Sequence, residues 1–111
     1  IREAPSLLLI KELLEHGASV CAYDPEAMPA VKRQIGDQIE YSERHYEACE
    51  NADALIIVTE WNKFREPDFD YLKELLKQPV IFDGRNVYEL HTMREHGFTY
   101  YSIGRPDVQP A

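Results

Sequence analysis

The sequence has few cysteines and no long apolar run, and both scarcities exclude classes of protein. Cysteine occurs twice among 111 residues, at Cys21 and Cys49, without the spacing of a zinc site. We therefore expect two buried thiols in a reducing cytosol rather than a disulfide framework. No apolar run approaches the length that spans a bilayer, and the first residues do not read as a signal peptide.

Glycine and positive charge are also scarce. The five glycines are scattered, so the phosphate-binding patterns G-x-G-x-x-G and G-x-x-x-x-G-K-[ST] are both missing, and we expect no complete Rossmann cofactor site. Lysine and arginine number 12 against 20 acidic residues, a net charge of −8. This balance argues against a nucleic acid or an anionic membrane as partner, but it allows a local basic pocket for a small phosphorylated ligand.

What the chain does have is an apolar stretch at residues 54–61, Ala-Leu-Ile-Ile-Val-Thr-Glu-Trp. An apolar run without alternation is typical of a strand whose sheet is covered on both faces, as in parallel α/β proteins. Open α/β sheets bind ligands at the carboxyl ends of their strands. Function should therefore be sought at Thr59, at Glu60 and at the ends of the neighbouring strands.

Strand and helix patterns alternate along the whole chain. The strands are predicted at 19–24, 39–42, 54–58, 80–83 and 100–103, and the helices at 7–15, 27–35, 44–51, 69–77 and 87–96. This order predicts one domain with a Rossmann-like, doubly wound, mainly parallel sheet and helices on both faces. Residues 106–111 are rich in proline and lack periodicity, which predicts a disordered tail or a linker.

Two arginines stand at positions suited to binding anions. Arg2 lies just before the first predicted helix, and Arg85 follows Gly84 at the end of a predicted strand. A guanidinium can bind two oxygens of a phosphate at once, and helix N-termini and loops offer backbone N–H groups to the same ligand. From spacing alone, a solvated or ion-paired surface residue is the alternative for either arginine.

Carboxylates at strand ends suggest a phospho-acceptor, but the pattern of a response-regulator receiver fails. Asp83 is followed by Gly-Arg-Asn, and no lysine follows the last strand. We expect Asp24 and Asp83 to accept backbone N–H bonds and so to orient their loops. The four histidines do not form a metal pair and are expected on the surface: His16, His45, His91 and His96.

Four short motifs follow one another in the chain: Arg2-Glu3-Ala4-Pro5-Ser6, Tyr23-Asp24-Pro25, Ala52-Asp53-Ala54 running into Thr59-Glu60-Trp61 with Phe64, and Phe82-Asp83-Gly84-Arg85-Asn86. Each motif alone is weak. Their order and spacing, over nearly the whole chain, resemble the C-terminal UDP-binding domain of the UDP-glucose/GDP-mannose dehydrogenase family. The Thr-Glu-Trp form is most similar to that of UDP-glucose 6-dehydrogenases.

The resemblance implies a place in an oxidoreductase of polysaccharide biosynthesis. Such enzymes oxidise the C6 alcohol of a nucleotide sugar to a carboxylate in two NAD-dependent hydride transfers. By resemblance, Arg2 would approach the NAD held mainly by another domain, and Arg85 would contact the UDP-sugar; a guanidinium suits both tasks. Asp83 would brace the turn that carries Arg85, and Trp61 and Phe64 would pack their loop.

The resemblance also implies a cytoplasmic, homo-oligomeric parent enzyme, in which residues 1–105 are the UDP-sugar-binding domain and 106–111 a tail. The family's NAD-binding domain, helical dimerisation region and catalytic cysteine have no counterpart here. Cys21 and Cys49 lie in no matching motif. We therefore predict no catalytic residue in this chain and no catalysis by it alone.

The family's first strand, which carries a Phe-Lys pair facing the substrate, also lacks a counterpart in the sequence. By the family's order it would lie between the strand ending at Asp24 and the strand ending at Glu60. Its absence would leave two strand edges with unpaired backbone groups, which another segment or chain must cover. A free-standing Rossmann-like regulatory or interaction module remains the alternative to the dehydrogenase interpretation.

Overall fold

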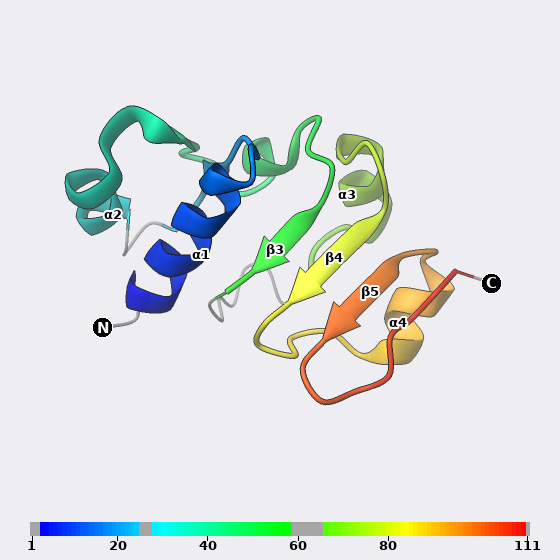
Figure 1. Ribbon diagram of the computed structural model, residues 1–111. Coiled ribbons are helices and arrows are strands. Elements are labelled where there is room, and N and C mark those ends of the chain that lie inside the picture. Colours follow the sequence, from blue (N-terminus) through cyan, green and yellow to red (C-terminus); the bar gives the residue numbers. More distant parts are fainter. Residues whose placement is uncertain (1–2, 25–27, 59–65, 111) are drawn as a thin grey trace. The chain divides into compact units, whose positions relative to one another are not determined.

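The computed structural model describes residues 3–24, 28–58 and 66–110. In chain order these form α1 (Glu3–Glu15), β1 (Cys21–Ala22), α2 (Met28–Ile35), η1 (Gly36–Gln38), β2 (Glu40–Tyr41), η2 (Glu47–Cys49), β3 (Leu55–Ile57), α3 (Phe69–Leu75), β4 (Val80–Asp83), α4 (Leu90–Glu95) and β5 (Thr99–Ser102), as Figure 1 shows. Among these elements, no helix is both long enough and apolar enough to cross a membrane.

The strands form two parallel sheets. One has the order β1-β2 and the other β3-β4-β5, and every ladder between these strands is parallel. Since α3 and α4 each connect two parallel neighbours, β3-α3-β4-α4-β5 is a run of βαβ units. The predicted Rossmann-like α/β class is confirmed. β1 and β3, between which the family's missing first strand would lie, belong to different sheets.

The chain divides into two compact units, residues 1–48 and 49–111. In the first unit α1 ends as predicted: Gly17 has a φ of +87°, and the N–H groups of Gly17 and Ala18 return to the carbonyls of Leu14 and Leu13 at 3.0 and 2.9 Å. This is the left-handed cap that favours glycine. The core of this unit consists of Ile10, Val31, Ile35 and Ile39.

Two predicted elements of the first half of the chain are shorter than expected. The ladder of β1 with β2 covers two residues only, and a single 3₁₀ turn, η2, replaces the helix predicted at 44–51. Just before that segment, the Ser42 hydroxyl donates to the carbonyl of Arg44 at 2.6 Å and accepts from its N–H at 3.1 Å. This local side-chain turn competes with a helix.

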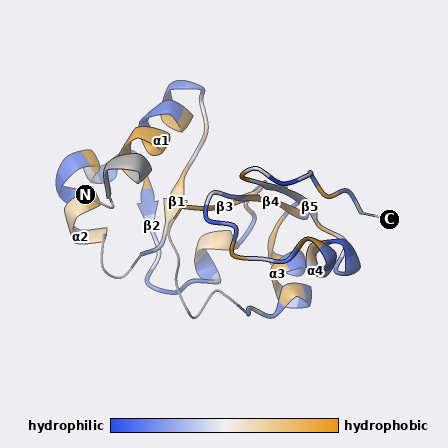
Figure 2. Cartoon of the chain, turned by 90° about the horizontal axis from the view of Figure 1, so that it is seen from below, coloured by the Kyte–Doolittle hydropathy of each residue, from blue (hydrophilic) through white to orange (hydrophobic). Residues whose placement is uncertain are grey.

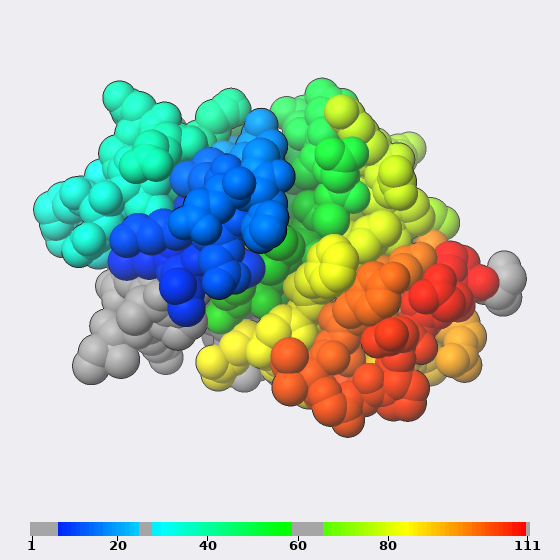
Figure 3. Space-filling model, viewed as in Figure 1, coloured from blue at the N-terminus to red at the C-terminus, as the bar shows by residue number. Residues whose placement is uncertain are grey.

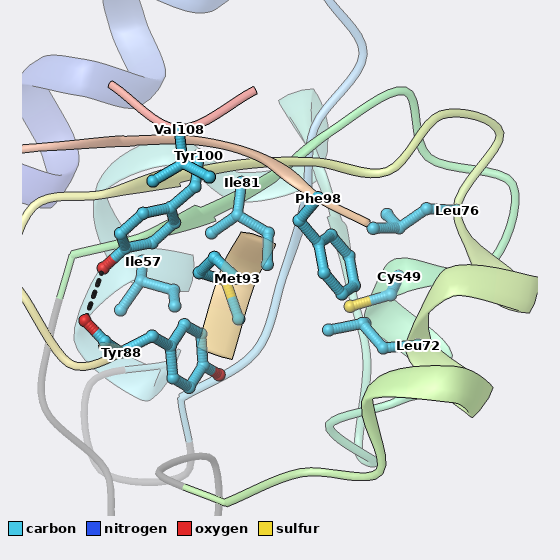
Figure 4. Close-up of a cluster of buried hydrophobic side chains, with 10 residues drawn as sticks. All are labelled: Cys49, Ile57, Leu72, Leu76, Ile81, Tyr88, Met93, Phe98, Tyr100 and Val108. Atoms are coloured by element: carbon cyan, nitrogen blue, oxygen red, sulfur yellow. Dashed lines mark hydrogen bonds between the residues drawn. The ribbon is translucent and has the colours of Figure 1, made fainter. Parts of the chain in front are cut away.

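In the second unit α3 and α4 lie on the same side of the sheet (Figure 2). α3 begins where predicted, because the Asp68 side chain accepts the N–H of Tyr71 at 3.1 Å as its N-cap. One core cluster joins the sheet to both helices (Figure 4); its buried members are Cys49, Ile57, Leu72, Leu76, Ile81, Tyr88, Met93, Phe98, Tyr100 and Val108.

The opposite face of β3-β4-β5 carries an apolar row. Ile56, Phe82 and Tyr101 are neighbours in register, and the rings of Phe82 and Tyr101 stack at 4.9 Å. The sequence predicts that both faces of β3 are buried. The face with Ile57 is buried, but Ile56, on the opposite face, is 37% exposed. The apolar run could not reveal this difference, because both faces of β3 are apolar.

The segment after β5 differs from the predicted disordered tail or linker. Val108 and Tyr100 exchange backbone hydrogen bonds of 2.9 and 3.0 Å in an antiparallel bridge, and Val108 is 1% exposed. Burial of one valine side chain together with two backbone hydrogen bonds offsets part of the cost of ordering this short segment. Pro106 and Pro110 flank Val108 and favour the prediction of an irregular segment, so the sequence does not indicate that Val108 is buried.

Candidate functional site

The carboxylate of Asp83, at the end of β4, organises the turn that follows it. Asp83 is 2% exposed. Its Oδ1 accepts the backbone N–H of Arg85 at 2.9 Å, and its Oδ2 accepts those of Val87 and Tyr88 at 2.7 and 3.2 Å. A buried carboxylate with several N–H donors is well satisfied. The predicted role of Asp83 in orienting its loop is therefore confirmed.

The same bonds explain why the helix predicted at 87–96 begins later, at Leu90. The N–H groups of Val87 and Tyr88 point to the Asp83 carboxylate, so residues 84–88 form a turn. Gly84 starts that turn close to β3: its N–H donates to the Ile57 carbonyl at 2.8 Å, and a Cβ at this position would lie 3.1 Å from the same oxygen. Arg85 follows and is exposed.

Asn86 links this turn to the loop after β5. Its backbone has a φ of +52°, a conformation that asparagine adopts more readily than most residues. The Asn86 amide donates to the Ile103 carbonyl and accepts the Ile103 N–H, both at 2.9 Å. Figure 3 shows the yellow segment after β4 and the orange segment after β5 side by side on the surface.

A second link runs through Arg105 and Tyr100. The Tyr100 hydroxyl donates to Oδ2 of Asp83 at 2.6 Å, and it also lies 3.2 Å from the Tyr88 carbonyl (Figure 4). Arg105 donates from Nη2 to that hydroxyl at 2.8 Å, from Nη1 to the Tyr88 carbonyl at 3.1 Å and from Nε to the Ser102 Oγ at 3.1 Å. Its guanidinium carbon lies 5.6 Å from the centre of the Tyr100 ring.

The environment of Tyr100 keeps its hydroxyl protonated. Burial, followed by the hydrogen bond to Asp83, raises the pKa of Tyr100 far above its usual range. The hydroxyl therefore remains a donor to the carboxylate over the whole physiological pH range. Hydrogen bonds thus connect the end of β4 to the end of β5. Arg85 is exposed on the turn that these bonds hold, and a guanidinium in this position is suited to an anionic ligand.

The predicted site residues lie only partly within the described structure. Arg85 follows the carboxyl end of β4, the position predicted, and it is exposed. Arg2 lies outside the described residues, and so do Thr59, Glu60, Trp61 and Phe64. Asp24 is half-buried, and its backbone contacts Met28, with the carbonyl accepting the N–H at 2.9 Å.

Three contributors to the site were not identified from the sequence: Asn86, Tyr100 and Arg105. One signal was available, since a Gly-Arg pair comes soon after each strand: Gly84-Arg85 directly after β4 and Gly104-Arg105 one residue beyond the end of β5. The sequence could not distinguish the two arginines, because only the fold directs Arg105 inward to Tyr100 and leaves Arg85 exposed.

The four histidines follow the expectation of a surface location only in part. His16 and His91 are exposed, whereas His45 and His96 are half-buried. His96 packs on Phe69 with ring centres 4.9 Å apart, and its Nδ1 lies 3.8 Å from an Asp70 oxygen. Across residues 3–24, 28–58 and 66–110 no cluster of three or more potential metal ligands occurs.

The two cysteines differ from each other, and the prediction of two buried thiols is wrong for Cys21. Cys49 is 2% exposed in the core of the second unit, whereas Cys21 is exposed. Partial desolvation, then the charges of Glu40 and Glu47, raise the pKa of Cys21. A raised pKa lowers the thiolate fraction near neutral pH, so Cys21 is a poor nucleophile.

We expect iodoacetamide at neutral pH to alkylate Cys21 more slowly than it alkylates free glutathione, and Cys49 only after unfolding. Peptide mapping by mass spectrometry over a time course would give both rates, and the same protein in concentrated urea is the control, in which the two cysteines should react alike. Native labelling of Cys49 as fast as in urea would contradict the burial of this thiol.

Comparison with known proteins gives one consistent result. Residues 1–90 match the profile of the UDP-glucose/GDP-mannose dehydrogenase family, UDP binding domain. The UDP-glucose 6-dehydrogenase TuaD of Bacillus subtilis is 46% identical over 98% of this chain, and the UDP-glucose 6-dehydrogenase of Rhizobium meliloti is 44% identical over 96%. The chain spans 24% of the length of each of these relatives.

A solved structure agrees with these matches. The NDP-N-acetyl-D-galactosaminuronic acid dehydrogenase from Methanosarcina mazei superposes with a TM-score of 0.71 at 30% identity, over 91% of this chain and 20% of the other. The Asp83-Gly84-Arg85-Asn86 turn lies within the residues that the family profile covers.

Proposed function

Because this chain belongs to the UDP-glucose/GDP-mannose dehydrogenase family, we propose that it binds the UDP-sugar substrate of an NAD-dependent UDP-glucose 6-dehydrogenase. The parent enzyme would convert UDP-glucose to UDP-glucuronate in two hydride transfers, in the cytoplasm, as a homo-oligomer. The observation that carries the proposal is the position of Arg85, an exposed residue on a turn that Asp83 holds at the carboxyl end of β4.

The chemistry of this turn supports an anionic, oxygen-rich ligand. The chain carries a net charge of −8, so an exposed arginine at a strand end is a local exception to the overall charge. A guanidinium offers two parallel N–H donors to a phosphate or to vicinal sugar oxygens. The ordered turn below it reduces the entropy lost on binding.

The turn after β4 does not fit the pyrophosphate of NAD. A pyrophosphate is usually held by free backbone N–H groups of a glycine-rich turn at a helix start. In the turn after β4 the N–H groups of Arg85, Val87 and Tyr88 already donate to Asp83, and no G-x-G-x-x-G occurs in the sequence. We therefore assign the main NAD site to another part of the parent enzyme and keep Arg2 as a proposed contact from this chain.

The proposal predicts NAD reduction by the full-length protein with UDP-glucose, and no turnover by residues 1–111 alone. Full-length protein and isolated chain would be assayed in parallel by NADH absorbance, with UDP-N-acetylglucosamine and GDP-mannose as competing substrates. Preference for UDP-glucose would support the proposal.

Turnover by the isolated chain above a buffer blank would overturn the proposal. The same applies if the full-length protein proves to be a regulatory or interaction module that reduces no NAD with any of the three sugars.

A further inference from the structure

We propose that Tyr100 and Arg105 are positioning residues for Arg85, which they hold in its ligand-binding orientation through the Asp83 carboxylate. The inference rests on the proposed role of Arg85 in binding the UDP-sugar. It makes the loop after β5 a support of the proposed substrate site. The arginine of that loop, Arg105, does not bind the ligand in this proposal but donates to Tyr100 and Tyr88.

The first step of the argument is the carboxylate. The position of the Arg85 backbone depends on Oδ1 of Asp83, which accepts its N–H at 2.9 Å. The orientation of that oxygen depends in turn on what holds Oδ2. Of its donors, the Tyr100 hydroxyl makes the shortest bond, 2.6 Å, and comes from another strand. The two backbone donors, Val87 and Tyr88, belong to the turn itself and move with it.

The second step is the guanidinium of Arg105. Its three described bonds go to the Tyr100 hydroxyl, the Tyr88 carbonyl and the Ser102 hydroxyl. Arg105 therefore connects Ser102, the last residue of β5, to Tyr88 at the end of the turn. Because the Tyr100 hydroxyl accepts a hydrogen bond from Arg105, its own proton is available to the Asp83 carboxylate. A planar fork can hold three acceptors of fixed direction, which a lysine ammonium on a flexible chain does less well.

The third step concerns the two neighbours of Arg85 in the chain, Gly84 and Asn86. Gly84 is held by the Ile57 carbonyl at 2.8 Å, and Asn86 by two bonds to Ile103. Arg85 thus lies between two anchored residues, and Asp83 sets the direction of its own N–H. A change at Tyr100 or Arg105 alters that direction without removing any group that contacts the ligand.

Tyr100→Phe and Arg105→Lys in the full-length enzyme test the proposal. Tyr100→Phe removes the bond from the Tyr100 hydroxyl to the Asp83 carboxylate, and Arg105→Lys weakens the bonds that the guanidinium donates. Since neither change removes a group that contacts the ligand, we expect the KM for UDP-glucose to rise about three- to tenfold while kcat and the KM for NAD stay within about twofold. The matched controls are Tyr101→Phe, on the other face of the same strand, and Arg94→Lys, exposed in the last turn of α4.

A double-mutant cycle separates positioning from stability. If Tyr100 acts through Arg85, Tyr100→Phe should have no further effect on the KM for UDP-glucose in an Arg85→Ala background. A full, additive effect in that background would overturn the proposal. So would a lowered melting temperature with unchanged KM, which is the result expected of a merely structural hydrogen bond.

The outcomes also distinguish the two proposals. If Arg85→Ala raises the KM but Tyr100→Phe and Arg105→Lys behave like their controls, only the positioning role is wrong. If Arg85→Ala itself leaves the KM unchanged, the role of Arg85 in substrate binding fails, and the positioning role fails with it.

Discussion

Replacing Arg85 by alanine in the full-length dehydrogenase should lower kcat/KM for UDP-glucose by about 10–150-fold. A charge-assisted hydrogen bond to a ligand oxygen contributes about 1.5–3 kcal/mol, and this factor is the same free energy expressed as a ratio. The Asp83 carboxylate accepts the backbone N–H of Arg85, a bond that alanine at this position retains. Steady-state kinetics with varied UDP-glucose at saturating NAD would measure the loss.

Two further variants define what is lost. Arg85→Lys keeps the charge but replaces a planar fork with a point charge, so we expect only partial recovery of kcat/KM. Arg94→Ala removes an exposed arginine from the same unit and should leave kcat/KM within about twofold. The assigned role of Arg85 would be refuted by an alanine variant whose kcat/KM equals that of Arg94→Ala.

The sequence was informative about the elements of the second unit because each has a local signal. Asp68 caps α3, and a buried apolar run identifies β4, whose observed bounds, Val80–Asp83, are those predicted. The carboxylate at its end was likewise predicted to orient its loop. These features depend on residues close together in the chain, whose side chains compete locally for backbone groups. The start of α4 was nevertheless predicted too early, because the bonds from Val87 and Tyr88 to Asp83 were not foreseen.

Features that depend on distant residues were not predictable in the same way. Tyr100 and Asp83 are 17 positions apart, as are Asn86 and Ile103, so only the parallel pairing of β4 with β5 brings them together. The bridge between Tyr100 and Val108 is likewise invisible in a tail rich in proline. Periodicity cannot tell which apolar face of β3 is covered, since that depends on where α3 and α4 pack.

A second large effect is expected from Asp83→Ala, this time on stability. The substitution leaves three backbone N–H groups without their acceptor, and the Tyr100 hydroxyl keeps only the Tyr88 carbonyl at 3.2 Å. A buried donor without a partner costs about 1–3 kcal/mol. Since the hydrogen bonds of Arg85 and Val87 are only partly buried, we expect a total loss of about 3–5 kcal/mol in the free energy of unfolding of residues 49–111.

Amide hydrogen exchange in the full-length enzyme under increasing urea would measure this loss locally, because a multidomain protein does not melt in one step. Asp83→Asn should fall between alanine and wild type: it keeps one acceptor oxygen, but it turns an NH₂ group toward N–H donors. Asp53→Ala, at an exposed bend before β3, is the matched control and should change exchange little. If the Asp83→Ala protein exchanged its amides at 80–105 as slowly as the Asp53→Ala protein, the carboxylate would not hold the turn. The backbone N–H of Arg85 would then have to be held by a partner other than Asp83.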